Sequence, residues 1–155
     1  MAKKPTTPNT RPTADNRQAR FEYEILDRYV AGIMLTGSEV KSIRAGKAQL
    51  QDAYCGFQGG ELWIRNLLIS PYSHGGYANH EPLRVRKLLL KQTELKSLRK
   101  SVQEKGLTIV PLRMFFNARN LVKVEVGLAR GKKLYDKRES IKTREQERSA
   151  RRGDD

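Results

Sequence analysis

Three basic residues, Lys41, Arg44 and Lys47, are spaced three positions apart along the chain. On a helix this spacing gathers their side chains on one surface, because residues three and four positions apart are neighbours there. Ammonium and guanidinium groups placed together bind the phosphates of a nucleic acid. A solvated helix face without a ligand is the alternative interpretation of any short basic helix.

The loop from residue 70 to residue 82 carries four aromatic side chains, Tyr72, His74, Tyr77 and His80. These rings could stack on unpaired bases of an RNA, and an ordinary surface loop is the alternative. The six-residue spacing of the two histidines in a Gly-rich loop fits no standard zinc site.

Catalytic chemistry has little support in the sequence. Cys55 is the only cysteine and lies in an apolar strand pattern, which is typical of a small core residue and allows no intrachain disulfide. No nucleophile, base and orienting group occur together at a useful spacing, and no carboxylate cluster suggests paired metal ions. We therefore expect a protein that is not an enzyme and that needs no cofactor and no metal.

The charge of the chain favours a polyanionic partner. The 155 residues include 31 Lys and Arg against 17 Asp and Glu, a formal net charge of +14. Residues 21–130 alone hold 17 basic and 10 acidic residues, so the termini cannot account for binding by themselves. No apolar run approaches the roughly 20 residues that span a bilayer, and no hydrophobic segment follows the N-terminal lysines. We expect a cytoplasmic protein.

Composition divides the chain into three parts. Residues 1–15 are rich in Pro, Thr, Lys and Asn and lack periodicity, which predicts a disordered basic leader. Residues 16–130 carry the patterns of one folded domain. Residues 131–155 hold four apolar or aromatic positions, too few for a core, and we predict a tail that is disordered when free and helical along a polyanion. Fully helical, it would reach about 37 Å at ~1.5 Å per residue, whereas a solubilising tail without a role is the alternative.

Alternating apolar residues predict strands in the first half of the domain. The odd positions from 21 to 35 are apolar except at Asp27, which indicates a long strand, or two, with a turn or bend at Asp27. Gly59-Gly60 predicts a two-residue hairpin that joins a strand over 53–58 to a strand over 61–69.

A second hairpin is predicted from residues 107–116 and 121–129, and Pro111 marks an edge or a bulge because it cannot donate a ladder hydrogen bond. Alternation assigns two sets of side chains to the buried face, and they are Val110, Leu112, Met114 and Phe116 with Val122, Val124, Val126 and Leu128. It assigns Arg113, Lys123 and Glu125 to the other face.

Two helices complete the predicted domain. Thr36 to Glu39 matches a capping box before a helix over 38–45, and Leu95, Leu98 and Val102 form the buried stripe of a helix over 91–105. That stripe uses one of the leucines 88–90, so at least one other must pack elsewhere or be exposed. We predict a mainly β protein, a small closed OB-like barrel with two peripheral helices and the C-terminal tail.

Five motifs in one order resemble the SmpB family, the SsrA-binding proteins of bacterial ribosome rescue. They are NRQAR at 16–20, SEVKSIRAGKA at 38–48, RKLLL at 86–90, GLARGKK at 127–133 and DKR at 136–138. The resemblance implies an OB-like barrel that binds the tRNA-like domain of transfer-messenger RNA and delivers this RNA to stalled ribosomes. It also implies that the tail enters the empty mRNA channel near the decoding region of the small subunit.

The resemblance assigns RNA-binding roles to Asn16, Lys41, Arg44, Leu89 and Lys123. Charge adds Lys47 to this set, and it adds Arg17 and Arg20 as a basic arm whose alternative is a solvated leader. The tail residues expected to act on the ribosome are Gly131, Lys132, Lys133, Tyr135, Asp136, Lys137 and Arg138.

One position departs from the family pattern, because Val30 stands where relatives often carry Glu before Ala31-Gly32. We expect a monomer without a membrane partner. A ribosomal protein or a general OB-fold translation factor that binds structured RNA is the alternative function, since composition and strand pattern fit it equally well. A nuclease is a third hypothesis, and it lacks a catalytic constellation.

Overall fold

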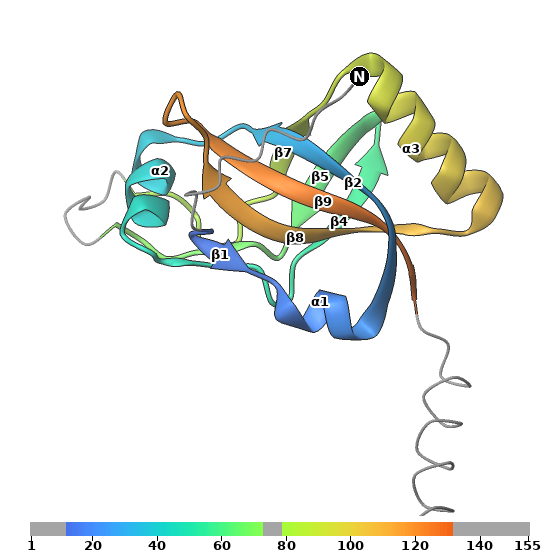
Figure 1. The fold of residues 1–155 in the computed structure, drawn as a ribbon. Coiled ribbons are helices and arrows are strands. Elements are labelled where there is room, and N and C mark those ends of the chain that lie inside the picture. The colour runs from blue at the N-terminus through green and yellow to red at the C-terminus, as the bar shows by residue number, and fades with distance from the viewer. Residues whose placement is uncertain (1–11, 73–78, 132–155) are drawn as a thin grey trace, which may run out of the picture.

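The computed structural model describes residues 12–72 and 79–131 (Figure 1). Most of the predicted leader, the loop residues His74 and Tyr77, and the tail beyond Gly131 lie outside the described residues. The strands are β1 (Ala14–Asp15), β2 (Tyr23–Ile33), β3 (Ala48–Gln49), β4 (Tyr54–Gln58), β5 (Glu61–Arg65), β6 (Leu68–Ile69), β7 (Arg86–Leu89), β8 (Thr108–Phe116) and β9 (Val122–Gly131). The helices are α1 (Arg17–Glu22), α2 (Gly37–Arg44) and α3 (Gln92–Lys105).

Six strands of the main sheet close into a ring. The order is β1-β8-β4-β5-β7-β2-β9, and an additional pairing of β8 with β9 closes the ring, with β1 attached outside it. All of these pairs are antiparallel, and β3 and β6 form a separate two-stranded sheet. The predicted mainly β, OB-like fold is therefore confirmed.

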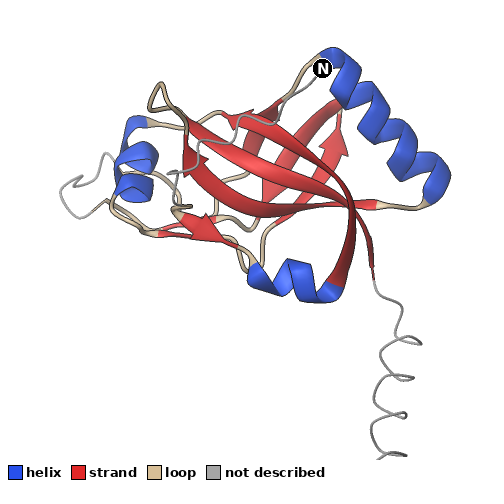
Figure 2. Cartoon of the chain, viewed as in Figure 1, coloured by secondary structure: helices blue, strands red, loops and turns tan. Residues whose placement is uncertain are grey.

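Apolar side chains that point into the ring form the core. Its fully buried members include Ala31, Ile43, Leu62, Ile64, Leu88, Leu98, Met114, Val124 and Val126. Ile43 belongs to α2 and Leu98 to α3, so both helices are held by packing against the strands. The helices lie at the periphery of the sheet, with α2 and α3 on opposite sides of the view in Figure 2.

The first hairpin forms as predicted, and its second strand is shorter than predicted. Gly59 and Gly60 both have positive φ, +61° and +78°, as a turn between β4 and β5 requires. The predicted strand over 61–69 breaks at Asn66, which has a φ of 59°. Residues after this break leave the ring and form β6, which pairs with β3.

Two β-bulges bend the long strands. The β2–β9 register shifts between Ile25 and Asp27, so the predicted irregularity at Asp27 is a bulge within one strand. The β8–β9 register shifts between Pro111 and Arg113, which confirms the predicted bulge and leaves Leu112 as the extra residue.

The second bulge corrects the predicted face of β8. An extra residue reverses the alternation of side chains, so Met114 and Phe116 pack on the core whereas Val110 and Leu112 do not. Val110 and Leu112 instead form a second apolar cluster with Ala19 of α1 and Ala129 of β9. Helix α1 therefore covers a part of the outer surface of the ring.

Helices α2 and α3 match their predictions, whereas α1 was not predicted. The Asn16 side chain caps α1 by accepting a hydrogen bond from the Ala19 N–H, 3.2 Å away. The apolar alternation of Phe21 and Tyr23 suggested a strand, but Phe21 ends up on the helix and 70% exposed. The predicted leader also ends earlier than expected, because Ala14–Asp15 form β1 on the edge of β8.

Candidate nucleic-acid interface

Leu89 and Lys123 meet on the outer surface of the ring, over Gly32. Gly32 of β2 pairs with Leu89 of β7 on one side and with Lys123 of β9 on the other. A Cβ placed on Gly32 would lie 3.3 Å from Leu89 Cβ and 3.6 Å from Lys123 Nζ, so glycine opens the space between them. Leu89 is 46% exposed, which identifies it as the leucine of the triplet that leaves the core. We call Gly32, Leu89 and Lys123 the β7–β2–β9 patch.

Charged side chains extend this patch across β2, β9 and β8. The buried carboxylate of Glu125 lies with its Oε1 3.4 Å from Arg28 Nη1 and 3.6 Å from Arg113 Nε. The Arg113 guanidinium also stacks over the Phe115 ring, with 4.8 Å from Cζ to the ring centroid. One carboxylate thus orders two guanidinium groups, and this group of three keeps a net positive charge.

Sequence alternation placed Arg113, Lys123 and Glu125 on one face, and the structure agrees. Arg28 was missed, because the bulge at Asp27 makes its direction ambiguous in the sequence. Val30 of β2 pairs directly with Glu125 of β9. The carboxylate at this point of the face therefore comes from β9 and not from β2.

The basic residues of α2 are exposed and partly held by aromatic rings. Lys41 Nζ lies 5.6 Å from the centroid of the Tyr72 ring, and Arg44 Cζ lies 5.2 Å from the centroid of the Phe116 ring. These cation–π contacts restrict the side chains while leaving their charges at the surface. Lys47, after the helix, is exposed as well. Because Phe116 is next in sequence to Phe115, which pairs with Lys123, α2 lies at the same end of the ring as the patch.

A buried ionic network fixes α2 on the ring. Glu39 is fully buried, and its carboxylate accepts hydrogen bonds from Arg86 Nε at 2.5 Å and from Arg84 Nη2 at 2.6 Å. It also accepts from the Thr36 N–H at 2.8 Å, which is one half of the predicted capping box. Arg86 is fully buried too, and its Nη1 donates to Leu67 O at 2.7 Å.

The charges of this network stabilise each other. Burial by itself raises the pKa of the Glu39 carboxyl, but hydrogen bonds from Arg84, Thr36 and Arg86 and the charge of Arg86 outweigh it and hold that pKa below its ordinary value. Burial lowers the pKa of the Arg86 guanidinium, and the neighbouring Glu39 opposes this change. Only a capping role was predicted for Glu39, because its two arginine partners lie 45 and 47 positions away in the sequence.

His80 has a structural role in the described part of the loop. Its Nε2 lies 2.8 Å from Ile69 O, a group that only accepts, so Nε2 carries the proton. Its Nδ1 therefore accepts from the Ser38 hydroxyl at 2.9 Å. His80 therefore joins the loop to α2 through Nδ1 and to β6 through Nε2.

Asn16, predicted to bind RNA, is 3% exposed. Its Nδ2 donates to Pro111 O at 2.9 Å, and its Oδ1 accepts from the Ala19 N–H, so each amide atom makes one hydrogen bond inside the protein. Arg17 and Arg20 are exposed on α1, and Arg20 Nη2 lies 3.0 Å from Asp15 Oδ1. Asn16 therefore positions α1, and its predicted contact with RNA stays a prediction.

The predicted residues therefore fall into two groups. The patch and α2 lie at the end of β2 where Gly32 pairs with Lys123, whereas α1 lies at the other end, where Tyr23 pairs with Gly131. The remaining tail residues, from Lys132 to Arg138, are outside the described residues.

Residues 12–72 and 79–131 contain neither a metal-binding group of side chains nor a reactive thiol. No group of three or more His, Cys, Asp or Glu in these stretches could hold a metal ion. Burial raises the pKa of the Cys55 thiol well above its ordinary value, as for a core residue. None of the described helices is long and apolar enough to cross a membrane.

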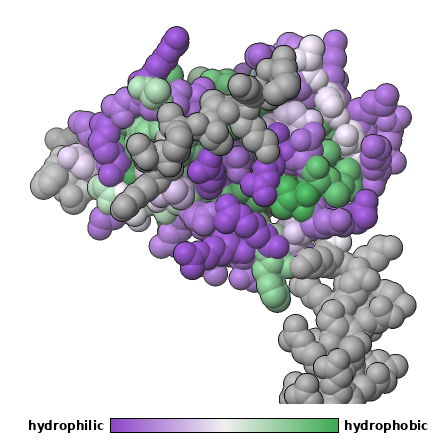
Figure 3. Space-filling model, in the orientation of Figure 1, coloured by the Kyte–Doolittle hydropathy of each residue, from purple (hydrophilic) through white to green (hydrophobic). Residues whose placement is uncertain are grey.

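The fold and the charged face together define a class: a small OB-like β domain with a basic surface of the kind that binds nucleic acid. Hydrophilic residues cover much of the face shown in Figure 3. A model of the SmpB protein family matches residues 13–154. The chain belongs to the SmpB family.

Relatives and a solved structure agree with this assignment. The SsrA-binding protein of Cytophaga hutchinsonii is 55% identical over 137 residues, which cover 88% of this chain and 90% of the relative. The SsrA-binding protein of Chlorobaculum tepidum is 51% identical over 148 residues, which cover 96% of this chain and 94% of the relative. A solved chain from work on tmRNA–SmpB at the centre of the bacterial ribosome is 54% identical, with a TM-score of 0.65, and the match covers 77% of this chain and 84% of that chain.

Proposed function

We propose that this protein is a non-catalytic adaptor that binds the tRNA-like domain of transfer-messenger RNA and delivers this RNA to stalled ribosomes. The observation that carries the proposal is the β7–β2–β9 patch beside α2, in a chain whose relatives are SsrA-binding proteins. A ribosomal partner would place the protein in the cytoplasm.

The patch suits a folded RNA better than a protein or a small molecule. Lys123 and the α2 cations supply contacts to phosphates, which release counterions and make binding dependent on salt. Leu89 offers an apolar surface to a sugar or a base face. The Glu39–Arg86 pair fixes the angle of α2, so the cations are presented as one rigid array.

The position of the tail supports a separate role on the ribosome. The patch lies at Gly32 and the tail leaves from Gly131, which pairs with Tyr23 at the opposite end of β2. Nine residues of extended strand correspond to about 30 Å at ~3.3 Å per residue. A tail that starts this far from the RNA-binding patch can enter the empty mRNA path while the body holds transfer-messenger RNA.

A competition experiment tests the proposal. Purified protein is mixed with labelled tRNA-like domain RNA at physiological salt, and unlabelled ribosomal RNA fragments of equal length compete. A one-to-one complex that survives excess competitor is expected. Equal displacement by both RNAs would instead indicate a ribosomal protein or a general translation factor.

The absence of catalysis is part of the same proposal. Incubation of the protein with the tRNA-like domain RNA, with and without Mg²⁺, should leave the RNA intact. Cleavage that follows the protein through purification would overturn this part of the proposal.

A further inference from the structure

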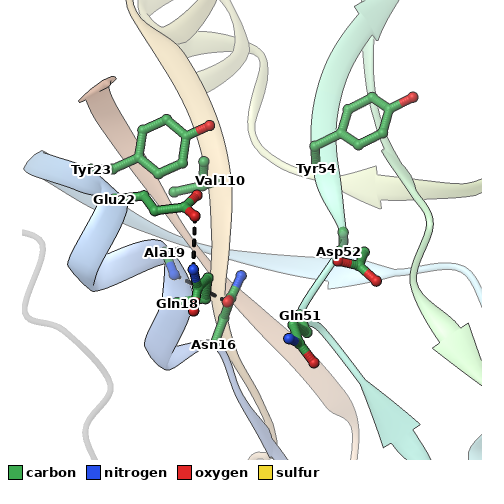
Figure 4. Close-up of a pocket in the computed structure, with 10 residues that line it drawn as sticks. Asn16, Gln18, Ala19, Glu22, Tyr23, Gln51, Asp52, Tyr54 and Val110 are labelled. Atoms are coloured by element: carbon green, nitrogen blue, oxygen red, sulfur yellow. Dashed lines mark hydrogen bonds between the residues drawn. The ribbon is translucent and has the colours of Figure 1, made fainter. Parts of the chain in front are cut away.

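A polar cavity of about 360 Å³ lies between α1 and the turn that precedes β4. Its two walls face each other in Figure 4. One wall carries Gln18, Glu22 and Tyr23, and the other carries Gln51, Asp52 and Tyr54. The volume is at the lower end of the range for small-ligand pockets, roughly 300–1,000 Å³, and suits one small planar group.

Both walls are held in place by buried residues at the base of the cavity, among them Asn16, Ala19 and Ala53. Helix α1 is held by the two hydrogen bonds of the buried Asn16 amide and by Ala19, which packs on Val110. On the other side, Ala53 N–H donates to Leu50 O at 2.9 Å, and both of these residues are buried. The two residues between them, Gln51 and Asp52, are therefore pushed outward to the cavity. The site is formed before any ligand arrives.

The lining chemistry is unusual for a protein this basic. No Lys or Arg lines the cavity, and its two charged groups are carboxylates, which only accept hydrogen bonds when ionised. Glu22 Oε1 accepts from Gln18 Nε2 at 2.8 Å. In the described part of the chain no side chain pairs with the Asp52 carboxylate. Tyr23 and Tyr54 add aromatic faces, and Tyr54 is 49% exposed.

We propose that this cavity binds one unpaired guanine of an RNA, with Asp52 accepting from the guanine N1–H and N2–H₂ groups and a tyrosine ring stacking on the base. Guanine is the base whose Watson–Crick edge presents two adjacent donors. Adenine and cytosine would turn a ring acceptor toward the carboxylate, and uracil offers one donor between two acceptors. Stacking of splayed-out bases on aromatic side chains is the common mode of single-stranded RNA recognition.

The surroundings favour an RNA over a basic peptide. Arg17 and Arg20 are exposed on the outside of α1, next to the cavity wall, and can bind the phosphates that flank a flipped base. The cavity is separate from the β7–β2–β9 patch, because Tyr23 and Gly32 lie at opposite ends of β2. The two sites can therefore be occupied together, by one RNA or by two.

This inference rests on RNA binding as the function, and probing with kethoxal tests it. Kethoxal reacts with N1 and N2 of unpaired guanines, so a bound guanine is protected from the reagent. Full-length protein is added to the tRNA-like domain RNA in one arm and to small ribosomal subunits in the other. We expect the wild-type protein to protect a guanine in one of the two arms. The arm in which protection occurs shows whether the guanine belongs to the tRNA-like domain RNA or to the ribosomal RNA. Asp52→Asn should abolish this protection and weaken affinity for that RNA about tenfold, and Tyr54→Ala should reduce the same protection.

Glu104→Gln, which removes one exposed carboxylate from α3, serves as the matched control and should protect the guanine as wild type does. If wild type binds RNA but no guanine in either arm depends on Asp52, the inference is wrong while the adaptor function stands. If wild type binds neither RNA, the adaptor function fails together with the inference.

Discussion

Lys123 is the residue on which the RNA-binding face most depends. Its ammonium group lies beside Leu89 over Gly32, in the centre of the patch. Lys123→Glu should weaken binding of the tRNA-like domain RNA roughly tenfold and lower the slope of log affinity against log salt by about one, because a phosphate contact is lost. A filter-binding series at several salt concentrations measures both quantities.

Lys96→Glu is the matched control for this change, because Lys96 is exposed on α3 and the net charge changes equally. If both variants lose the same affinity, binding reflects overall charge and not the patch.

Glu39 contributes to the pH dependence of stability. Its pKa in the folded protein lies below the ordinary value of 4.5, so its contribution to the free energy of unfolding is complete above pH 4.5. This contribution disappears as the pH falls through the lowered pKa. Glu39→Gln should cost about 3–5 kcal/mol at pH 7, because Arg86 would keep a buried charge without its partner.

The variant should also lose less stability than wild type on acidification below pH 4.5. Urea unfolding of both proteins between pH 7 and pH 3 measures the two effects. Parallel loss of stability in wild type and variant would show that Glu39 does not titrate as the geometry requires.

At the scale of single elements, α1 depends on one buried amide. Asn16→Ala removes the helix cap, which is typically worth about 1 kcal/mol, and leaves Pro111 O without its donor. We expect a stability loss of about 2 kcal/mol and faster hydrogen exchange confined to α1. Gln18→Ala, an exposed change on the same helix, should have little effect on either measurement. Equal exchange in α1 of wild type and Asn16→Ala would contradict this role.

The packing of β8, β9 and β2 depends on Gly127. A Cβ at this position would lie 3.0 Å from Leu112 Cδ1 and 3.1 Å from Ile25 Cγ2, closer than ordinary contacts. Gly127→Ala should therefore destabilise the fold by about 1–3 kcal/mol through overpacking. Gly56→Ala is the control, because nothing lies within 4 Å of a Cβ placed there. Thermal unfolding compares the two, and equal midpoints would argue against the close packing.

Elements with strong local signals could be predicted from the sequence. The capping residues before α2, the leucine spacing of α3 and the Gly59-Gly60 turn each determine structure within a few residues. Helix α1 could not be predicted, because its single turn and a half depends on packing of Ala19 against Val110 and Ala129, far away in the sequence. The Glu39–Arg86 pair and the cavity beside α1 could not be predicted either, because the residues that form them are also far apart in the sequence.

In the complete domain, the two proposed roles belong to opposite ends of β2. The patch and α2 hold the RNA at one end, and the chain leaves the domain at Gly131 at the other. Residues 131–155 contribute nine basic and six acidic residues, a small part of the net charge of +14. The body should therefore keep its RNA affinity without this segment.

Deletion of residues 131–155 tests this division, with RNA affinity and tagging on stalled ribosomes measured on the same preparation. We expect affinity for the tRNA-like domain RNA to stay within about threefold of wild type, since most phosphate contacts remain, whereas tagging should be lost. An equal loss of affinity and tagging would instead show that this segment contributes to RNA binding, and the two roles would not be separate.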